Sequence, residues 1–240
     1  MFFRNIQYSK SILVLVLMIV FTHSCKKDTI ATIDLGYNYC PVKIGKYVIY
    51  DVDSIVKSGD FKADTFKFQI KEQIDSIVTD NVGRITYKLK RYIRKKNNDT
   101  IPYNLISWTL KDVWVLNRTE TTAEQVEENC RFIKLIFPIK QDKTWNGNAY
   151  NVNKPLDYEY TEVDVPHSYG GLNFDSTVFV TQWNYKNNIQ KNYYVEVYAK
   201  NIGMIYKQMD SVKLDIGVSI EKYFKEGFRY KMVVNSYGTE

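Results

Sequence analysis

The feature that most constrains the fold is a succession of short segments in which apolar and polar residues alternate. Residues 65–77 place Phe66, Phe68 and Ile70 on one side of the chain, and residues 85–93 repeat the pattern. A period of two puts alternate side chains on opposite faces of a β-strand. Roughly ten such segments follow one another, which is typical of an all-β domain. They are residues 45–55, 65–77, 85–93, 105–116, 131–139, 158–165, 174–183, 193–199, 204–212 and 228–234.

Turn residues separate these segments, and no strongly helical pattern lies between them. Residues 82–84, 169–171 and 201–203 all carry the glycine that is typical of turns. Short turns between strands favour an antiparallel meander over βαβ units, and the lack of a fixed repeat argues against a propeller. We therefore expect an all-β, mainly antiparallel fold. It is one strongly curved sheet, a half-barrel or an open barrel, with a two-sheet β-sandwich as the alternative.

Two stretches depart from simple alternation. Residues 119–129 are acidic and poor in apolar side chains. We expect either one or two helical turns there, capped by Thr121 or Thr122, or an exposed loop. In either form this stretch is not expected to be buried. Asn146-Gly147 is a strong short signal for a hairpin turn.

The first 28 residues are organised differently from the rest. Arg4 and Lys10 precede an apolar run, residues 12–21, which is followed by Ser24 and Cys25. A basic head, an apolar centre and small residues before the processing point form the layout of a secretory signal peptide. The apolar run has about ten residues, fewer than the ~20 that a permanent membrane-spanning helix needs.

A cysteine directly after such a leader resembles the lipobox of bacterial lipoproteins. The charged stem at residues 26–28 resembles lipoproteins of Bacteroidetes, and the β domain resembles uncharacterised envelope proteins of that group. Ser24 fits the small residue before the cysteine, whereas Thr22 and His23 depart from the usual box. The resemblance implies cleavage before Cys25, acylation of that cysteine, and attachment to the outer membrane, facing either the periplasm or the cell surface.

The chain is therefore expected to have three parts. Residues 1–24 form the signal peptide, residues 25–35 comprise the lipidated cysteine and a flexible tether, and residues 36–240 form a single β domain. The membrane is a partner of this protein through the lipid on Cys25.

Charge and cysteine content limit the other partners. The formal net charge is +6, and it falls to +4 once Arg4 and Lys10 leave with the leader. Basic residues are scattered among acidic ones, and an exported protein rarely meets nucleic acid, so no nucleic-acid partner is expected. Beyond Cys25, the thiols of Cys40 and Cys130 form either a disulfide in an oxidising envelope or two separate buried thiols.

No catalytic, metal-binding or cofactor motif stands out. His167 is the one histidine after the leader, so a multi-histidine metal site is excluded, and its loop-like surroundings predict an exposed residue. No Gly-x-Ser-x-Gly nucleophile elbow is present. Two facing carboxylates would suffice for a glycoside hydrolase, but alternating acids usually mark the solvated face of a strand. The acids concerned are Asp51, Asp53, Asp157, Glu159, Glu162 and Asp164.

The aromatic content permits two interpretations of the β domain. Aromatic residues make up 15% of the chain, with 20 Tyr and 4 Trp. Large aromatics suit strands and fill a core, but exposed Tyr and Trp also stack on sugar rings. We expect a lipid-anchored, non-enzymatic envelope protein whose β domain binds a glycan, an apolar ligand or a protein partner. A carboxylate-based hydrolase of glycans and a purely structural envelope component are the alternatives.

Blocking lipidation tests the interpretation of the leader. Cys25→Ala, or treatment of cells with the signal-peptidase inhibitor globomycin, should leave unprocessed precursor or release the domain from membranes. The physical reason is that membrane binding rests on the acyl chains, at about 0.8 kcal/mol per buried methylene. Immunoblots of cell fractions measure both effects, with Cys130→Ala as the control. Unchanged fractionation of the Cys25 variant would contradict the lipid anchor.

Overall fold

The structure is a computed structural model that describes residues 33–59, 62–96, 100–214 and 224–240. Residues 34–240 form one compact unit. Cys25, the predicted signal peptide and the predicted tether up to residue 32 lie outside the described residues. In the part of the chain that is described, no helix has both the length and the apolar character needed to cross a membrane.

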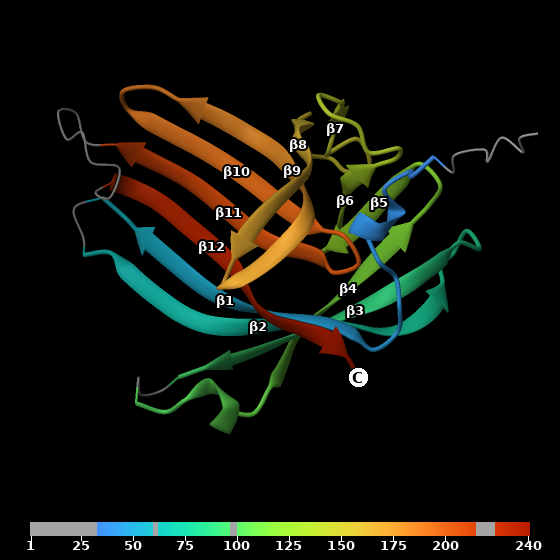
Figure 1. Ribbon diagram of the computed structural model, residues 1–240. Coiled ribbons are helices and arrows are strands. Elements are labelled where there is room, and N and C mark those ends of the chain that lie inside the picture. The colour runs from blue at the N-terminus through green and yellow to red at the C-terminus, as the bar shows by residue number, and fades with distance from the viewer. Residues whose placement is uncertain (1–32, 60–61, 97–99, 215–223) are drawn as a thin grey trace, which may run out of the picture. The chain divides into compact units, whose positions relative to one another are not determined.

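The fold is all-β, and the prediction of an open barrel is confirmed. Among the described residues, twelve strands form one antiparallel sheet that curves into a nearly closed barrel with one open seam (Figure 1). Two short 3₁₀ turns, η1 (Tyr37–Tyr39) and η2 (Tyr103–Leu105), accompany the sheet. The strands are β1 (Lys46–Lys57), β2 (Asp64–Thr79), β3 (Ile85–Lys95), β4 (Thr109–Arg118), β5 (Thr122–Glu127), β6 (Cys130–Ile136), β7 (Thr144–Asn146), β8 (Asp157–Tyr169), β9 (Leu172–Lys186), β10 (Gln190–Ala199), β11 (Gly203–Leu214) and β12 (Phe224–Thr239).

Strands that are neighbours in sequence pair with each other, and the first strand also pairs with the last. The order is β6-β5-β4-β3-β2-β1-β12-β11-β10-β9-β8-β7. The β1–β12 ladder runs from Lys46 opposite Thr239 to Lys57 opposite Gly227. This pairing joins the two halves of the chain into one sheet and leaves β6 and β7 at its two edges.

The seam between β6 and β7 is bridged largely by side chains. The Tyr160 hydroxyl donates to the Ile136 carbonyl at 2.9 Å and accepts from the Ile136 N–H at 2.8 Å. The Trp145 indole N–H donates to the Ile133 carbonyl at 2.9 Å. One backbone hydrogen bond, from the Ile133 N–H to the Gly147 carbonyl, measures 2.9 Å. These bonds satisfy edge groups that would otherwise favour pairing with another chain.

Alternation along the strands sorts side chains between the inside and the outside of the barrel. In β1, Val48, Tyr50 and Val52 are buried, whereas Asp51 and Asp53 are exposed. The expectation that these two acids mark a solvated face is therefore confirmed. They do not face each other across a cleft.

The β8–β9 hairpin adds a second layer outside part of the sheet. Three register shifts interrupt its pairing, and its far end crosses β11 and β12 (Figure 1). There, Tyr169 stacks on Tyr206 with ring centroids 4.6 Å apart. Gly170 has a φ of +60°, and a Cβ on it would lie 1.9 Å from the Val234 carbonyl oxygen, so glycine is required at this crossing.

Two local predictions were wrong. Residues 122–127 form strand β5, in which Ala123 and Glu124 are buried, instead of helical turns or an exposed loop. The acidic sequence tolerates burial because Glu124 pairs with Arg131 at 2.6 Å and accepts a hydrogen bond from Thr122 at 2.9 Å.

The Asn146-Gly147 dipeptide does not form a tight hairpin turn. β7 ends at Asn146, and residues 147–156 form a longer loop. The Asn146 side chain accepts hydrogen bonds from the N–H groups of Asn148 and Leu156, at 3.0 and 3.1 Å. The asparagine therefore organises the loop from its base instead of occupying a two-residue turn.

Removing the hydroxyl of Tyr160 tests the role of the seam. In Tyr160→Phe both polar groups of Ile136 lose their buried partner, so we expect the free energy of unfolding to fall by about 1–3 kcal/mol. Urea denaturation measures the change. Tyr237→Phe is the control, because its side chain is 43% exposed, and its effect should stay within about 0.5 kcal/mol. Equal losses in the two variants would contradict a specific role for the seam bonds.

Candidate functional site

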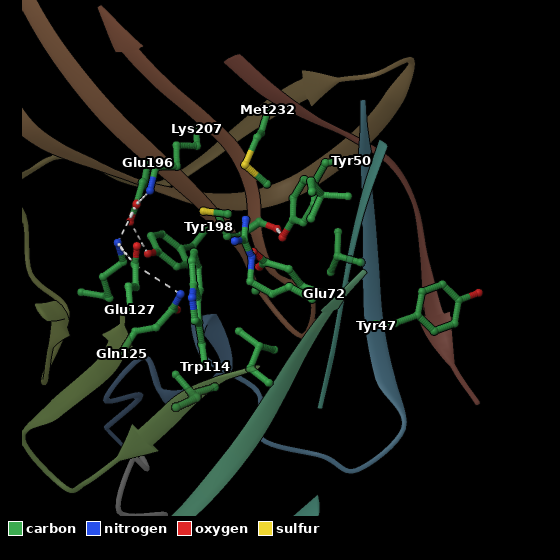
Figure 2. Close-up of a pocket in the computed structure, with 18 of the residues that line it drawn as sticks. Tyr47, Tyr50, Glu72, Trp114, Gln125, Glu127, Glu196, Tyr198, Lys207 and Met232 are labelled. Atoms are coloured by element: carbon green, nitrogen blue, oxygen red, sulfur yellow. Dashed lines mark hydrogen bonds and ion pairs between the residues drawn. The ribbon is translucent and has the colours of Figure 1, made fainter. Parts of the chain in front are cut away.

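The barrel holds a cavity of about 480 Å³, and Figure 2 shows many of the residues that line it. Three adjacent strands contribute a large part of its lining, through side chains that share the inner face of the sheet. These side chains are Val48, Tyr50, Ser54 and Val56 of β1, Phe68, Ile70 and Ile74 of β2, and Phe228, Tyr230 and Met232 of β12.

The cavity is elongated along the strands. Val48 and Val56 both line it, and the stretch of β1 between them spans about 26 Å at ~3.3 Å per residue. At one end the cavity meets the η1 segment, where Tyr39 and Cys40 are buried. At the other end Val56 is 44% exposed. The apolar wall therefore reaches solvent at that end.

A buried cluster of charged side chains forms another wall (Figure 2). The Lys134 ammonium lies 2.7 Å from Oε1 of Glu196 and 3.1 Å from Oε1 of Glu127. Lys207 contacts the same Glu196 oxygen at 3.0 Å. The Tyr198 hydroxyl donates to the other Glu196 oxygen at 2.6 Å. Two ammonium groups and two carboxylates thus neutralise one another inside the barrel.

The pKa shifts follow from this arrangement. Burial opposes the charge of Glu196, but Lys134 and Lys207 hold its pKa well below the ordinary value. Burial likewise opposes the charge of Lys134, but Glu127 and Glu196 raise its pKa. The pKa of Glu127 is lowered by Lys134 and Lys207 despite burial. Lys134 and both glutamates are therefore charged at neutral pH.

A second ion pair involves Arg91 of β3. Its Nε donates to Oε1 of Glu72 at 2.9 Å, and a terminal nitrogen donates to Oδ2 of Asp112 at 2.9 Å. The guanidinium carbon lies 3.6 Å from the ring centroid of Trp114. Charge-assisted hydrogen bonds and the ring face together fix this arginine against the cavity wall.

The predicted cysteines lie in different environments. Cys40 lines the cavity, and burial raises the pKa of its thiol to about 12. Cys130 begins β6 and is half-buried. Both are free thiols in the structure, and their pairing in an oxidising compartment stays a prediction.

His167 lies in strand β8 and is half-buried, so its prediction as an exposed loop residue was wrong. Its Nδ1 is 2.9 Å from the Thr177 hydroxyl and its Nε2 is 3.2 Å from Glu162. Three bulges in the β8–β9 ladder let this sequence continue as a strand through Pro166. Among the described residues, no group of three or more His, Cys, Asp or Glu is placed to hold a metal ion.

Sequence reasoning missed the charged residues of the cavity. The local sequence contains no signal for them, because a charge between two apolar residues, as at Glu196 and Lys134, is also the ordinary pattern of a strand with one solvated face. The missed residues are Glu72, Arg91, Glu127, Lys134, Glu196 and Lys207.

A solved structure resembles this chain over most of its length. It is a protein of Bacteroides fragilis, described as a candidate exported protein with a YmcC-like fold. The match covers 83% of this chain and 98% of the other, with 12% sequence identity and a TM-score of 0.43. No protein-family model and no curated protein matches the chain.

Removing the shared lysine tests the buried cluster. Lys134→Met leaves Glu127 and Glu196 without their common partner, so we expect the free energy of unfolding to fall by about 3–5 kcal/mol at neutral pH. Lys67→Met is the control, because Lys67 and Asp53 form an exposed pair with a 3.9 Å separation. Its effect should stay below about 1 kcal/mol. Urea denaturation measures both variants.

Measuring stability at lower pH distinguishes the loss of the ion pairs in Lys134→Met from a simple packing defect. In the wild type the folded pKa values of both glutamates lie below the ordinary 4.5. Their contribution to stability is therefore complete above about pH 4.5 and is lost as the pH falls through the lower folded values. In Lys134→Met these pKa values rise, so protonation relieves the unpaired charge and the deficit should shrink on acidification. A deficit that is independent of pH would contradict this account.

Proposed function

We propose that this protein is a lipid-anchored, non-enzymatic envelope protein whose β domain binds the apolar chain of an elongated ligand. The observation that carries the proposal is the elongated cavity of about 480 Å³ with its apolar wall. Its volume falls in the ~300–1,000 Å³ range of small-molecule sites, which are mostly apolar with a few placed polar groups.

The shape and lining of the cavity support a chain-like ligand. Val48, Ile70 and Met232 offer it aliphatic and thioether surface, and each methylene that leaves water there contributes about 0.8 kcal/mol. The partly exposed Val56 gives the cavity an apolar mouth. A chain could therefore enter the cavity end first at Val56.

The pairing of the cavity charges supports the non-enzymatic part of the proposal. A glycoside hydrolase needs one carboxylic acid whose raised pKa keeps it protonated at neutral pH. Glu127 and Glu196 have lowered pKa values instead, and Glu72 accepts a hydrogen bond from Arg91. We therefore assign these carboxylates to ion pairs with neighbouring lysine and arginine side chains instead of to catalysis.

The leader supports the placement at the outer membrane. A lipidated Cys25 holds a protein stably when it carries two or more acyl chains. The tether at residues 25–35 would then keep the domain close to the membrane. In that position the binding domain lies beside membrane lipids, whose apolar chains are the kind of ligand that its cavity suits.

Filling the cavity tests the proposal. Ser54→Trp places a large ring on the inner face of β1, and it should weaken binding of the fluorescent apolar probe N-phenylnaphthylamine about tenfold or more, or ~1.4 kcal/mol. Palmitate should displace the probe from the wild type. Fluorescence titration measures both. Asp53→Trp makes the same replacement on the exposed face of β1 and should bind like the wild type.

Unfolding curves for both variants establish that each is folded before binding is compared. Two outcomes would contradict the proposal. One is a wild-type protein that binds neither the probe nor palmitate, and the other is an equal loss of binding in the two tryptophan variants.

A further inference from the structure

A second cavity, of about 450 Å³, lies beside the first. Glu127, Lys134, Lys207 and Met209 line both cavities, so the charged cluster forms their common wall. The remaining lining comes from β6, from the loop at residues 147–156, and from β8, β9 and β10. This cavity therefore adjoins the seam of the barrel, at a place that the proposed apolar site does not use.

Aromatic side chains form one side of the second cavity. Trp183 lines it and is 38% exposed. Tyr194 packs edge-on against Trp183, with ring centroids 5.5 Å apart and an interplanar angle of 80°. This contact fixes the indole and leaves part of its surface open. Phe132 and Tyr158 also line the cavity.

A buried amide lines the same space. Gln182 is 5% exposed and adjoins Trp183 in sequence. Among the described residues, its Nε2 has no hydrogen-bond partner. Buried amide donors are nearly always paired, so this one points to an acceptor that the chain itself does not supply.

The loop at residues 147–156, which also lines the cavity, is held in place by its own asparagines. Asn148 donates to the Lys154 carbonyl at 2.7 Å and accepts from Asn151 at 3.2 Å. Asn151 also donates to the Arg131 carbonyl of β6 at 2.9 Å. The wall is thus fixed before any ligand arrives, which lowers the entropic cost of binding.

We propose that the second cavity binds a sugar ring, which stacks on Trp183 and accepts a hydrogen bond from Gln182 through a hydroxyl or ring oxygen. A sugar fits because its ring offers an apolar C–H face beside hydroxyl groups that both donate and accept. The common wall offers a charged ligand little, because its two lysines already pair with two glutamates, and Lys154, which also lines the cavity, is exposed to solvent. This site stands independently of the proposed apolar site.

Binding to immobilised oligosaccharides tests the proposal. The set covers hexoses, N-acetylhexosamines and uronic acids, and the domain should bind at least one of them. For that oligosaccharide, Trp183→Ala should weaken binding about tenfold or more, or ~1.4 kcal/mol. Trp108→Ala is the matched control, because Trp108 is not among the lining residues of this cavity, and it should bind like the wild type.

A second variant tests the same site even if Trp183→Ala does not fold. Gln182→Leu removes an unpaired buried donor, so it should keep or raise the thermal midpoint while it weakens oligosaccharide binding about tenfold or more. Ser54→Trp should leave oligosaccharide binding unchanged, which separates this site from the apolar one. Absence of binding to every oligosaccharide, or equal losses in the Trp183 and Trp108 variants, would overturn the proposal.

Discussion

The pairing of β1 with β12 is the contact on which the rest of the domain depends. Every other ladder joins strands that are neighbours in sequence, whereas this one joins the two ends of the domain. It makes β2, β1 and β12 one continuous surface, whose inner face is the apolar wall of the cavity. An ion pair adds a second link between these strands, because the Glu240 carboxylate just after β12 lies 2.8 Å from the Lys71 ammonium of β2. The cavity exists only once this long-range pairing has formed, which is the kind of contact that slows folding.

The sequence predicted the inner face of a strand well where the other face meets solvent, and poorly where both faces are covered. In β1 one face meets solvent at Asp51 and Asp53, so polar and apolar residues alternate in part and the strand was evident. In β10 the outer face is covered by the β8–β9 hairpin, and Val195, Glu196 and Val197 are all buried. Alternation then cannot tell which face is inside. An apolar residue is the usual choice for an inner face, yet it is Glu196, between two buried valines, that lines the cavity of the barrel.

The candidate site was less predictable than the fold, because its polar groups come from distant parts of the chain. Lys134 and Glu196 are 62 residues apart and meet only once the sheet has curved into the barrel. Strand β5 was missed for a related reason. Its acidic sequence suggested exposure, and the arginine that pairs with Glu124 lies on the next strand, β6. The local sequence does not show which distant residue will pair with a charge, whereas it does show the period-two alternation that predicts a strand.

The number of strands explains why space remains inside the barrel. A barrel of about eight strands is just wide enough for its own side chains to fill, and the diameter grows with the number of strands. Twelve strands enclose more space than apolar side chains occupy, and the Lys134 cluster stands within the excess, with a cavity on each side. Because its charges are paired across β5, β6, β10 and β11, the cluster fixes these strands relative to one another. A ligand that enters either cavity therefore spends little of its binding free energy on opening the site.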